Sequence, residues 1–218
     1  MNINTEAIFS PQPELKTERQ VPCSPLEWDE FKSFLSKMGI AVLQGKETSN
    51  RRITLAKYHT LICLGGYTGL RGSDLLSVTW EMVIGKEKFR ITEGKTKKVR
   101  EITLNEKCQN LIRHNYKLIK PYSDALSILY NKKFEPITIN AFNDQLEIYF
   151  SLFGVSTDNP SSHTLRKTFG KRFYEVHGKS EHALVLLMGI FNHSTLEETR
   201  KYIGITRIVI ANGYKLLD

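Results

Sequence analysis

Apolar residues recur at helical spacing along most of this chain, beginning after a polar amino-terminal segment. Residues 1–23 contain prolines but no such periodicity, and we interpret them as a flexible arm or linker. The tetrad Ser24-Pro25-Leu26-Glu27 matches a capping box with proline at the first helical position, which predicts the start of a helix. Trp28 and Phe31 lie on one face of this helix, and we expect it to end near Gly39.

A second, more buried helix is predicted over residues 52–67, where Leu55, His59 and Ile62 recur at helical spacing. The same periodicity predicts helices over residues 106–119, 139–153, 164–177, 181–191, 195–203 and 206–216. Another capping-box pattern, Ser194-Thr195-Leu196-Glu197, predicts that a helix begins just before Tyr202.

From Lys86 the helical period gives way to alternation. The segments K-F-R-I-T-E and K-V-R-E-I-T-L contain β-branched residues and are joined by Gly94-Lys95-Thr96-Lys97, which predicts a β-hairpin. The expected fold is therefore mainly α with a small antiparallel β-sheet (α+β). The length of 218 residues suits one domain, which we place at residues 24–218 with a carboxy-terminal tail at 204–218.

Charge favours a polyanionic partner without establishing one. The chain has 31 Lys and Arg against 23 Asp and Glu, a formal net charge of +8. Lysine and arginine supply most non-specific affinity for nucleic acid because they neutralise phosphates. An ordinary basic protein fits the same composition equally well.

Cysteine usage and hydropathy exclude several classes of protein. Cys23, Cys63 and Cys108 are far apart and form no C-x-x-C pair, so we expect neither a disulfide framework nor a zinc site. The amino terminus lacks the apolar core of a secretory signal, and the longest apolar stretch, residues 184–191, is too short to cross a bilayer. We expect a cytoplasmic protein with no membrane partner, no metal and no cofactor.

The first motif with chemical potential is T-G-L-R-G-S-D, which begins at Thr68. We expect Gly65, Gly66 and Gly69 to break the preceding helix, so that Arg71 stands at the start of a new one. A helix start favours a bound phosphate, and a guanidinium adds a bidentate donor to the same anion. Asp74 follows on the same face and is expected to hold Arg71. Taken alone, such an arginine is more often a surface residue.

The second and third motifs come late in the chain. In S-H-T-L-R, His163 is expected at the first position of a helix, which places Arg166 one turn along on the same face. In N-H-S, His193 precedes the predicted cap, and Tyr202 follows in the next helix. A phenol has an ordinary pKa near 10 and is a poor nucleophile unless a base or positive charge lies nearby. A solvated helix start and a half-buried tyrosine are the alternatives for these motifs in isolation.

The order of the pieces is more specific than any one of them. T-G-L-R ending at Arg71, a lysine at position 95 on a β-turn, H-T-L-R from His163, N-H-S at 192–194 and a tyrosine at 202 together resemble the tyrosine recombinase (phage integrase) family. The resemblance runs from about Ser24 to Ile205 and implies that residues 24–218 are a catalytic domain. It also implies six catalytic residues: Arg71, Lys95, His163, Arg166, His193 and Tyr202.

The roles follow from the resemblance. Arg71 and Arg166 would grip the scissile phosphate and His193 would hydrogen-bond to it. Tyr202 would attack phosphorus and form a 3′-phosphotyrosine, Lys95 would protonate the departing 5′ oxygen, and His163 would assist proton transfer at the tyrosine. The implied activity is site-specific recombination or integration of double-stranded DNA without metal or ATP, with self-association on DNA as a dimer to tetramer.

Two features depart from the family pattern. Asn192 stands where the family usually has glycine, although asparagine tolerates left-handed backbone angles better than most residues. Family members usually also carry an amino-terminal core-binding domain, so the chain is either a fragment or a short member. The apolar tail after Tyr202 needs a surface to pack on, in cis or on a neighbouring protomer.

Two other functions remain open at this point. A non-catalytic DNA-binding accessory module would have the same fold, and a topoisomerase-like enzyme would use similar chemistry without exchanging partners. The intact set of six residues argues against the first. The absence of a large clamp domain argues against the second.

Overall fold

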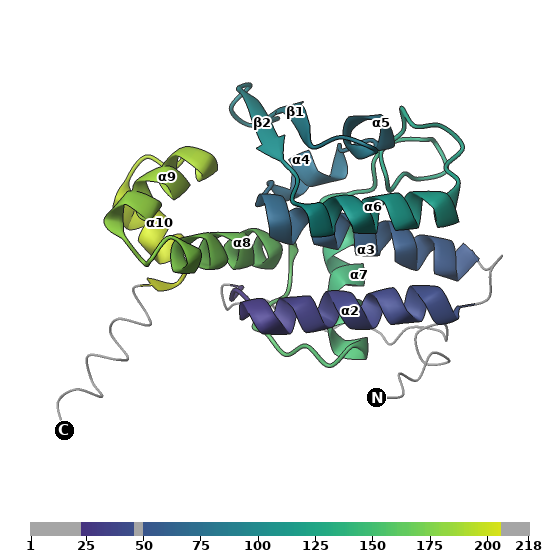
Figure 1. Ribbon diagram of the computed structural model, residues 1–218, viewed down its shortest axis with the longest axis horizontal. Coiled ribbons are helices and arrows are strands. Elements are labelled where there is room, and N and C mark those ends of the chain that lie inside the picture. Colours follow the sequence, from purple (N-terminus) through teal and green to yellow (C-terminus); the bar gives the residue numbers. More distant parts are fainter. Residues whose placement is uncertain (1–22, 46–49, 206–218) are drawn as a thin grey trace.

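The computed structural model describes residues 23–45 and 50–205 (Figure 1). Its elements are α2 (Trp28–Gln44), α3 (Asn50–Thr68), α4 (Gly72–Leu76), α5 (Trp80–Val83), β1 (Lys88–Thr92), β2 (Val99–Thr103), α6 (Glu106–Ile119), α7 (Ile139–Leu152), α8 (Ser162–Val176), α9 (Glu181–Phe191) and α10 (Leu196–Tyr202). The predicted mainly helical fold with one small antiparallel sheet is confirmed. Residues 1–22 of the arm proposed at 1–23 and the predicted helix at 206–216 lie outside the described residues.

Helix α3 forms the centre of the molecule. It packs against α2, α6 and α8, and residues around its whole circumference are buried. Its sequence therefore shows little amphipathic pattern, because no face of the helix is left for water. Figure 1 shows α3 between α6 and α2, with α8 extending from this body toward α9 and α10.

Three glycines predicted to end helices instead allow helices to approach each other. Gly39 lies inside α2, where a Cβ atom would be 3.3 Å from Cε1 of His59. Gly65 and Gly66 lie inside α3, and a Cβ atom on Gly66 would be 2.1 Å from Cζ of Phe31. Glycine removes the side chain at these contacts, so the expectation that these residues break helices is wrong.

The start of α2 also differs from the prediction. The hydroxyl of Ser24 donates to Asp158 at 3.1 Å, and the backbone N–H of Leu26 donates to Thr168 Oγ1 at 2.9 Å. These bonds keep the predicted first turn extended against the α7–α8 connection and α8. The helix begins after Glu27, so the sequence pattern of a capping box does not act as one here.

The hairpin follows the predicted strands and turn. Lys88 pairs with Thr103, and Thr92 pairs with Val99. The backbone N–H of Glu93 donates to Lys98 at 2.9 Å and closes the loop. Alternation along β1 turns Phe89 and Ile91 inward.

Apolar residues form a large core and a smaller one. The large core covers α2 to α7 and includes Leu165 near the start of α8. The smaller core contains Leu184, Leu187, Phe191 and Ile203, with Tyr202 packed against it. Helix α8 belongs to both and joins α9 and α10 to the body of the molecule (Figure 1).

Most other helix bounds agree with the prediction within two residues. Short helix α5 was not predicted. The cap before α10 is Thr195, whose side chain accepts from the N–H of Glu198, while the Glu198 carboxylate accepts from the N–H of Ser194. The predicted capping box is therefore shifted by one residue. Within the described part of the chain, no helix is both long and apolar enough to span a membrane.

Candidate active site

Arg71 is the residue immediately before α4, at the helix start that the sequence predicts. Its Nη1 donates to Oε2 of Glu93 at 2.6 Å, and its Nη2 donates to the carbonyl oxygen of Phe191 at 2.8 Å. Asp74 was expected to hold this arginine, and that expectation is wrong. The Oδ1 atom of Asp74 instead accepts from the backbone N–H of Gly94 at 2.9 Å. The carboxylate that fixes Arg71 comes from the hairpin.

Arg166 lies beside Arg71 and shares an acceptor with it. Its Nη1 donates to the carbonyl of Gly69, and its Nη2 donates to the carbonyl of Phe191 at 3.0 Å. The guanidinium also stacks on the Phe191 ring, 4.3 Å from its centroid. Burial lowers the pKa of Arg166 to about 10, so the group remains a cation at neutral pH. One main-chain oxygen at the end of α9 therefore orients both predicted phosphate-binding arginines.

His163 and Tyr202 meet although they are 39 residues apart in the chain. The Nδ1 atom of His163 lies 3.0 Å from the phenol oxygen of Tyr202, within hydrogen-bond distance. His163 is the second residue of α8 rather than the first, because Ser161 caps the helix. Partial burial, with the charges of Arg166 and Lys167, lowers the pKa of His163.

Burial also controls the phenol. It raises the pKa of Tyr202 to about 12, although the charges of Arg166 and Arg71 oppose the rise. Both members of the pair are therefore neutral at pH 7, and in the tautomer with its proton on Nε2 the His163 imidazole accepts a hydrogen bond from the phenol. The pair can transfer one proton without first exchanging it with solvent.

His193 also lies beside Tyr202. Asn192 adopts a left-handed conformation with φ 52°, so asparagine provides the backbone angle that glycine usually provides at such a turn. Nδ1 of His193 lies 3.1 Å from Oγ1 of Thr199, and the His193 and Tyr202 ring centroids are 5.1 Å apart. Burial lowers the pKa of His193, with Arg166 and Arg71 adding to the effect and Glu198 opposing it.

Lys95 lies on the hairpin turn, exposed to solvent. The turn is tied down around it, since the Thr96 hydroxyl donates to Glu93 Oε2 at 2.8 Å. Farther along, Nζ of Lys98 donates to the Asn192 side chain at 3.2 Å, which joins the hairpin to the segment that carries His193. The structure thus groups Tyr202 with both arginines and both histidines, and it links the Lys95 turn to that group.

Sequence analysis did not assign Glu93 or Arg100 to the site. Nη2 of Arg100 donates to the carbonyl of Thr68, three residues before Arg71, at 2.8 Å, and its Nη1 is buried with no hydrogen-bond partner among the described residues. Burial lowers the pKa of Arg100, while Glu93 opposes that change. Strand alternation carries a signal for both residues, because a charged side chain on the inward face requires a buried partner.

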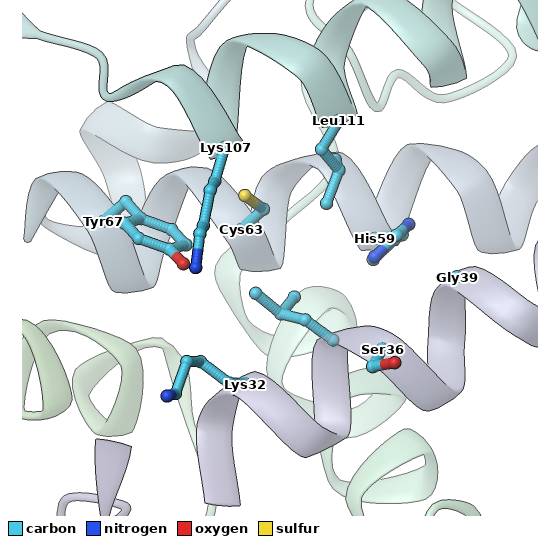
Figure 2. A pocket seen from close by; sticks show the side chains of 9 residues that line it. Lys32, Ser36, Gly39, His59, Cys63, Tyr67, Lys107 and Leu111 are labelled. Atoms are coloured by element: carbon cyan, nitrogen blue, oxygen red, sulfur yellow. The ribbon is translucent and has the colours of Figure 1, made fainter. Parts of the chain in front are cut away.

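A groove of about 340 Å³ lies elsewhere, between α2, α3 and α6 (Figure 2). Lys107 extends from α6 alongside Tyr67 of α3, and Cys63 and His59 lie deeper on α3. None of the six predicted site residues lines this groove. In the described residues, no three His, Cys, Asp or Glu side chains are grouped to hold a metal ion.

These elements form the catalytic-domain fold of the tyrosine recombinases. The family model described as "Phage integrase family" matches residues 33–207, and the chain belongs to that family. A relative from Bacillus subtilis (strain 168), described as probable integrase/recombinase YoeC, is 31% identical over 157 residues, which cover 72% of this chain and 82% of the relative.

Solved structures resemble this chain in fold. XerH site-specific recombinase bound to a palindromic difH substrate superimposes with a TM-score of 0.64 at 20% identity, over 89% of this chain and 53% of that chain. XerA recombinase gives a TM-score of 0.64 at 15% identity, over 92% of this chain and 66% of that chain. The chain therefore spans about half the length of the XerH chain that it matches.

Proposed function

We propose that this protein cleaves and rejoins strands of double-stranded DNA through a covalent 3′-phosphotyrosine at Tyr202. The observation that carries the proposal is the contact of His163 Nδ1 with the Tyr202 phenol at 3.0 Å, beside two guanidinium groups held by one carbonyl oxygen. A nucleophile, a base and two cations are the groups that phosphodiester transfer requires when no metal takes part.

In this proposal Arg71 and Arg166 bind the non-bridging oxygens of the scissile phosphate, and His193 donates a further hydrogen bond. The two guanidinium groups are already fixed by Phe191 and Glu93, so little reorganisation is needed when the phosphate enters. Their positive charge stabilises the negative charge that develops on the phosphate oxygens in the transition state.

The chemical step forms the bond between the phenol oxygen and phosphorus and breaks the bond between phosphorus and the 5′ oxygen. The phenol proton passes to Nδ1 of His163, and Lys95 gives a proton to the departing 5′ oxygen. Attack by a 5′-hydroxyl of another strand then reverses these transfers and rejoins the DNA. Because the phosphotyrosine retains the bond energy, the reaction needs no ATP.

Double-stranded DNA as partner follows from charge and family. The chain carries a net charge of +8, and such an excess of cations binds the phosphate backbone. In the fold relatives, XerH is bound to difH substrate, and a lambda integrase dimer is bound to a COC′ core site. We infer that this chain also binds duplex DNA and self-associates on it.

The test is capture of the covalent intermediate. A pool of duplexes, each nicked close to the cleavage position and randomised on both sides, is incubated with the protein and separated under denaturing conditions. The expected result is a protein–DNA adduct that Tyr202→Phe abolishes. Tyr122→Phe is the matched control, since this phenol is 84% exposed and outside the site, and it should leave the adduct yield unchanged.

The same assay separates this activity from the alternatives. Retarded duplex without any adduct, in wild type and Tyr202→Phe alike, would indicate an accessory DNA-binding module and overturn the catalytic proposal. An adduct that relaxes supercoiled plasmid but never joins to a second duplex would indicate a topoisomerase-like activity instead.

A further inference from the structure

One carboxylate at the hairpin turn connects two of the predicted catalytic parts. Oε2 of Glu93 accepts from Nη1 of Arg71 at 2.6 Å and from the hydroxyl of Thr96 at 2.8 Å. The Glu93 side chain is only 5% exposed, so both bonds are largely protected from water. Arg71 belongs to the proposed phosphate clamp, while Thr96 is the neighbour of Lys95.

The position of Glu93 follows from strand alternation. Phe89, Ile91 and Glu93 are successive inward positions, and all three residues are buried. An isolated ionised carboxylate at such a position would be strongly unfavourable, whereas paired charges are tolerated there. Although burial raises it, the hydrogen bonds from Thr96 and Arg71 hold the pKa of Glu93 below its ordinary value. Glu93 is therefore ionised and paired at neutral pH.

Lys95 is bracketed by two anchors. On one side, the N–H of Gly94 donates to Asp74 at 2.9 Å, and Asp74 belongs to α4, which begins directly after Arg71. On the other side, the Thr96 hydroxyl shares the carboxylate that binds Arg71. Both anchors lead to the Arg71 segment. The turn is thus docked in the free protein before any phosphate is bound.

We propose that Glu93 and Thr96 are positioning residues that hold the Lys95 turn in a fixed place relative to Arg71. Lys95, the proposed acid for the leaving group, is then aligned whenever Arg71 and Arg166 are in place to bind the phosphate. This inference rests on the proposed function and deepens it. Neither residue touches the reacting atoms. Glu93 acts through Arg71 and Thr96, and Thr96 acts through Lys95.

The expected defect is specific to the acid step. A displacement of about 1 Å in a catalytic group lowers the rate by roughly 10²-fold, and loss of a general acid lowers it by roughly 10²–10⁴-fold. A substrate whose 5′ bridging oxygen is replaced by sulfur releases a thiolate as the leaving group. Because a thiol is far more acidic than an alcohol, the thiolate can leave without a proton from Lys95. Misalignment of Lys95 should therefore slow only the oxygen substrate.

The experiment measures single-turnover adduct formation on matched oxygen-bridged and sulfur-bridged DNA, with the sequence selected by the capture assay. Thr96→Val removes the hydroxyl but keeps the shape of the side chain. We expect it to slow the oxygen substrate by about tenfold or more and the sulfur substrate less than about threefold. Glu93→Gln should show the same preference, and Lys95→Ala should show it most strongly.

Two variants control for structural effects. Thr96→Ser restores the hydroxyl and should recover the rate on the oxygen substrate. Thr92→Val changes an exposed threonine in the same hairpin and should leave both rates unchanged. Loss of rate on both substrates by the same factor in Thr96→Val and Glu93→Gln would overturn the inference, as would unchanged rates in both variants. An inactive wild type on either substrate would instead count against the proposed function itself.

Discussion

Burial keeps Tyr202 and His163 in their neutral forms at pH 7. The pKa of the phenol is raised to about 12 and that of His163 is lowered, so the free site holds a phenol and an unprotonated imidazole in contact. Because the His163 imidazole is already uncharged, it does not have to lose a proton when a phosphate binds. The nearby arginines favour the phenolate, because they stabilise negative charge on that oxygen.

This arrangement predicts the acidic limit of the reaction. Because the pKa of His163 is lowered from 6.5, the base stays unprotonated below that pH. We expect the rate of adduct formation to hold between pH 7 and 6.5 and to fall only at lower pH. Lys167→Gln removes one cause of the lowered pKa and should move the fall to higher pH. Single-turnover rates from pH 5 to 8 at saturating DNA measure both, and a wild-type inflection above pH 6.5 would contradict the prediction.

A second buried histidine makes stability depend on pH. Burial lowers the pKa of His59 from 6.5 to about 4, and its Nδ1 lies 3.2 Å from Nδ2 of Asn115. The unfolded state binds a proton below pH 6.5 that the folded state refuses until about pH 4. The unfolding free energy is therefore unaffected by His59 above about pH 6.5, and it decreases as the pH falls from 6.5 to about 4.

The difference corresponds to roughly 3 kcal/mol of unfolding free energy between pH 7 and pH 4. Urea denaturation of wild type and His59→Gln at both pH values isolates this contribution, because glutamine does not titrate. The variant should lose markedly less stability on acidification than wild type. An equal loss in the two proteins would show that His59 is not the titrating group.

At the scale of the helices, the effect of a glycine depends on whether another side chain packs against it. A Cβ atom on Gly66 would lie 2.1 Å from Cζ of Phe31, whereas one on Gly189 in α9 would meet nothing within 4 Å. We expect Gly66→Ala to lower the unfolding free energy by about 1–3 kcal/mol through overpacking. Gly189→Ala should instead raise it by about 0.5–1 kcal/mol through helix propensity. Chemical denaturation of both variants measures the two changes in unfolding free energy, and equal changes would contradict the packing argument.

Local pattern predicted most elements because helical and alternating periods are properties of short segments. The hairpin, α6 and α9 follow their predicted ranges closely. The errors at Gly39, Gly65 and Gly66 have one cause, since a glycine that ends a helix and one that admits a neighbouring helix are alike in sequence. The capping pattern at Ser24 failed because Asp158 binds its hydroxyl, and no local pattern reports that contact.

The six candidate site residues were predicted from their order and from the resemblance, which carry information from the whole family. The groups that hold the two arginines were not predicted. Glu93 and the carbonyl of Phe191 meet Arg71 only because the fold brings distant segments of the chain together. Asp74 was assigned to Arg71 by helical spacing, yet it binds the hairpin. Spacing along one helix cannot show which of two nearby carboxylates the fold brings to a guanidinium.

At the scale of the molecule, Tyr202, the proposed nucleophile, and the hairpin that carries Lys95 pack on different apolar cores. Tyr202 packs on the small core of Leu184, Leu187, Phe191 and Ile203, while Leu70, the neighbour of Arg71, and the inward apolar side chains of the hairpin belong to the large one. Helix α8 carries His163 and Arg166 between them. The small core buries few apolar side chains and should open at lower free energy than the body.

Native-state hydrogen exchange tests this division. Amides of α9 and α10 should lose protection at lower denaturant concentration than those of α3. Leu187→Ala should lower the opening free energy of α9 and α10 by about 2–5 kcal/mol, with a smaller effect on α3. Identical protection in all three helices would show a single cooperative unit and exclude separate opening of the segment that carries Tyr202.

The acceptor that both guanidinium groups share is the main-chain oxygen of residue 191. Substitution there alters the packing of the small core but cannot delete the oxygen, because every amino acid has one. A one-residue insertion or deletion within the last turn of α9 would instead rotate that oxygen away from both arginines together. During divergence this helix end can therefore drift in composition while its length stays fixed.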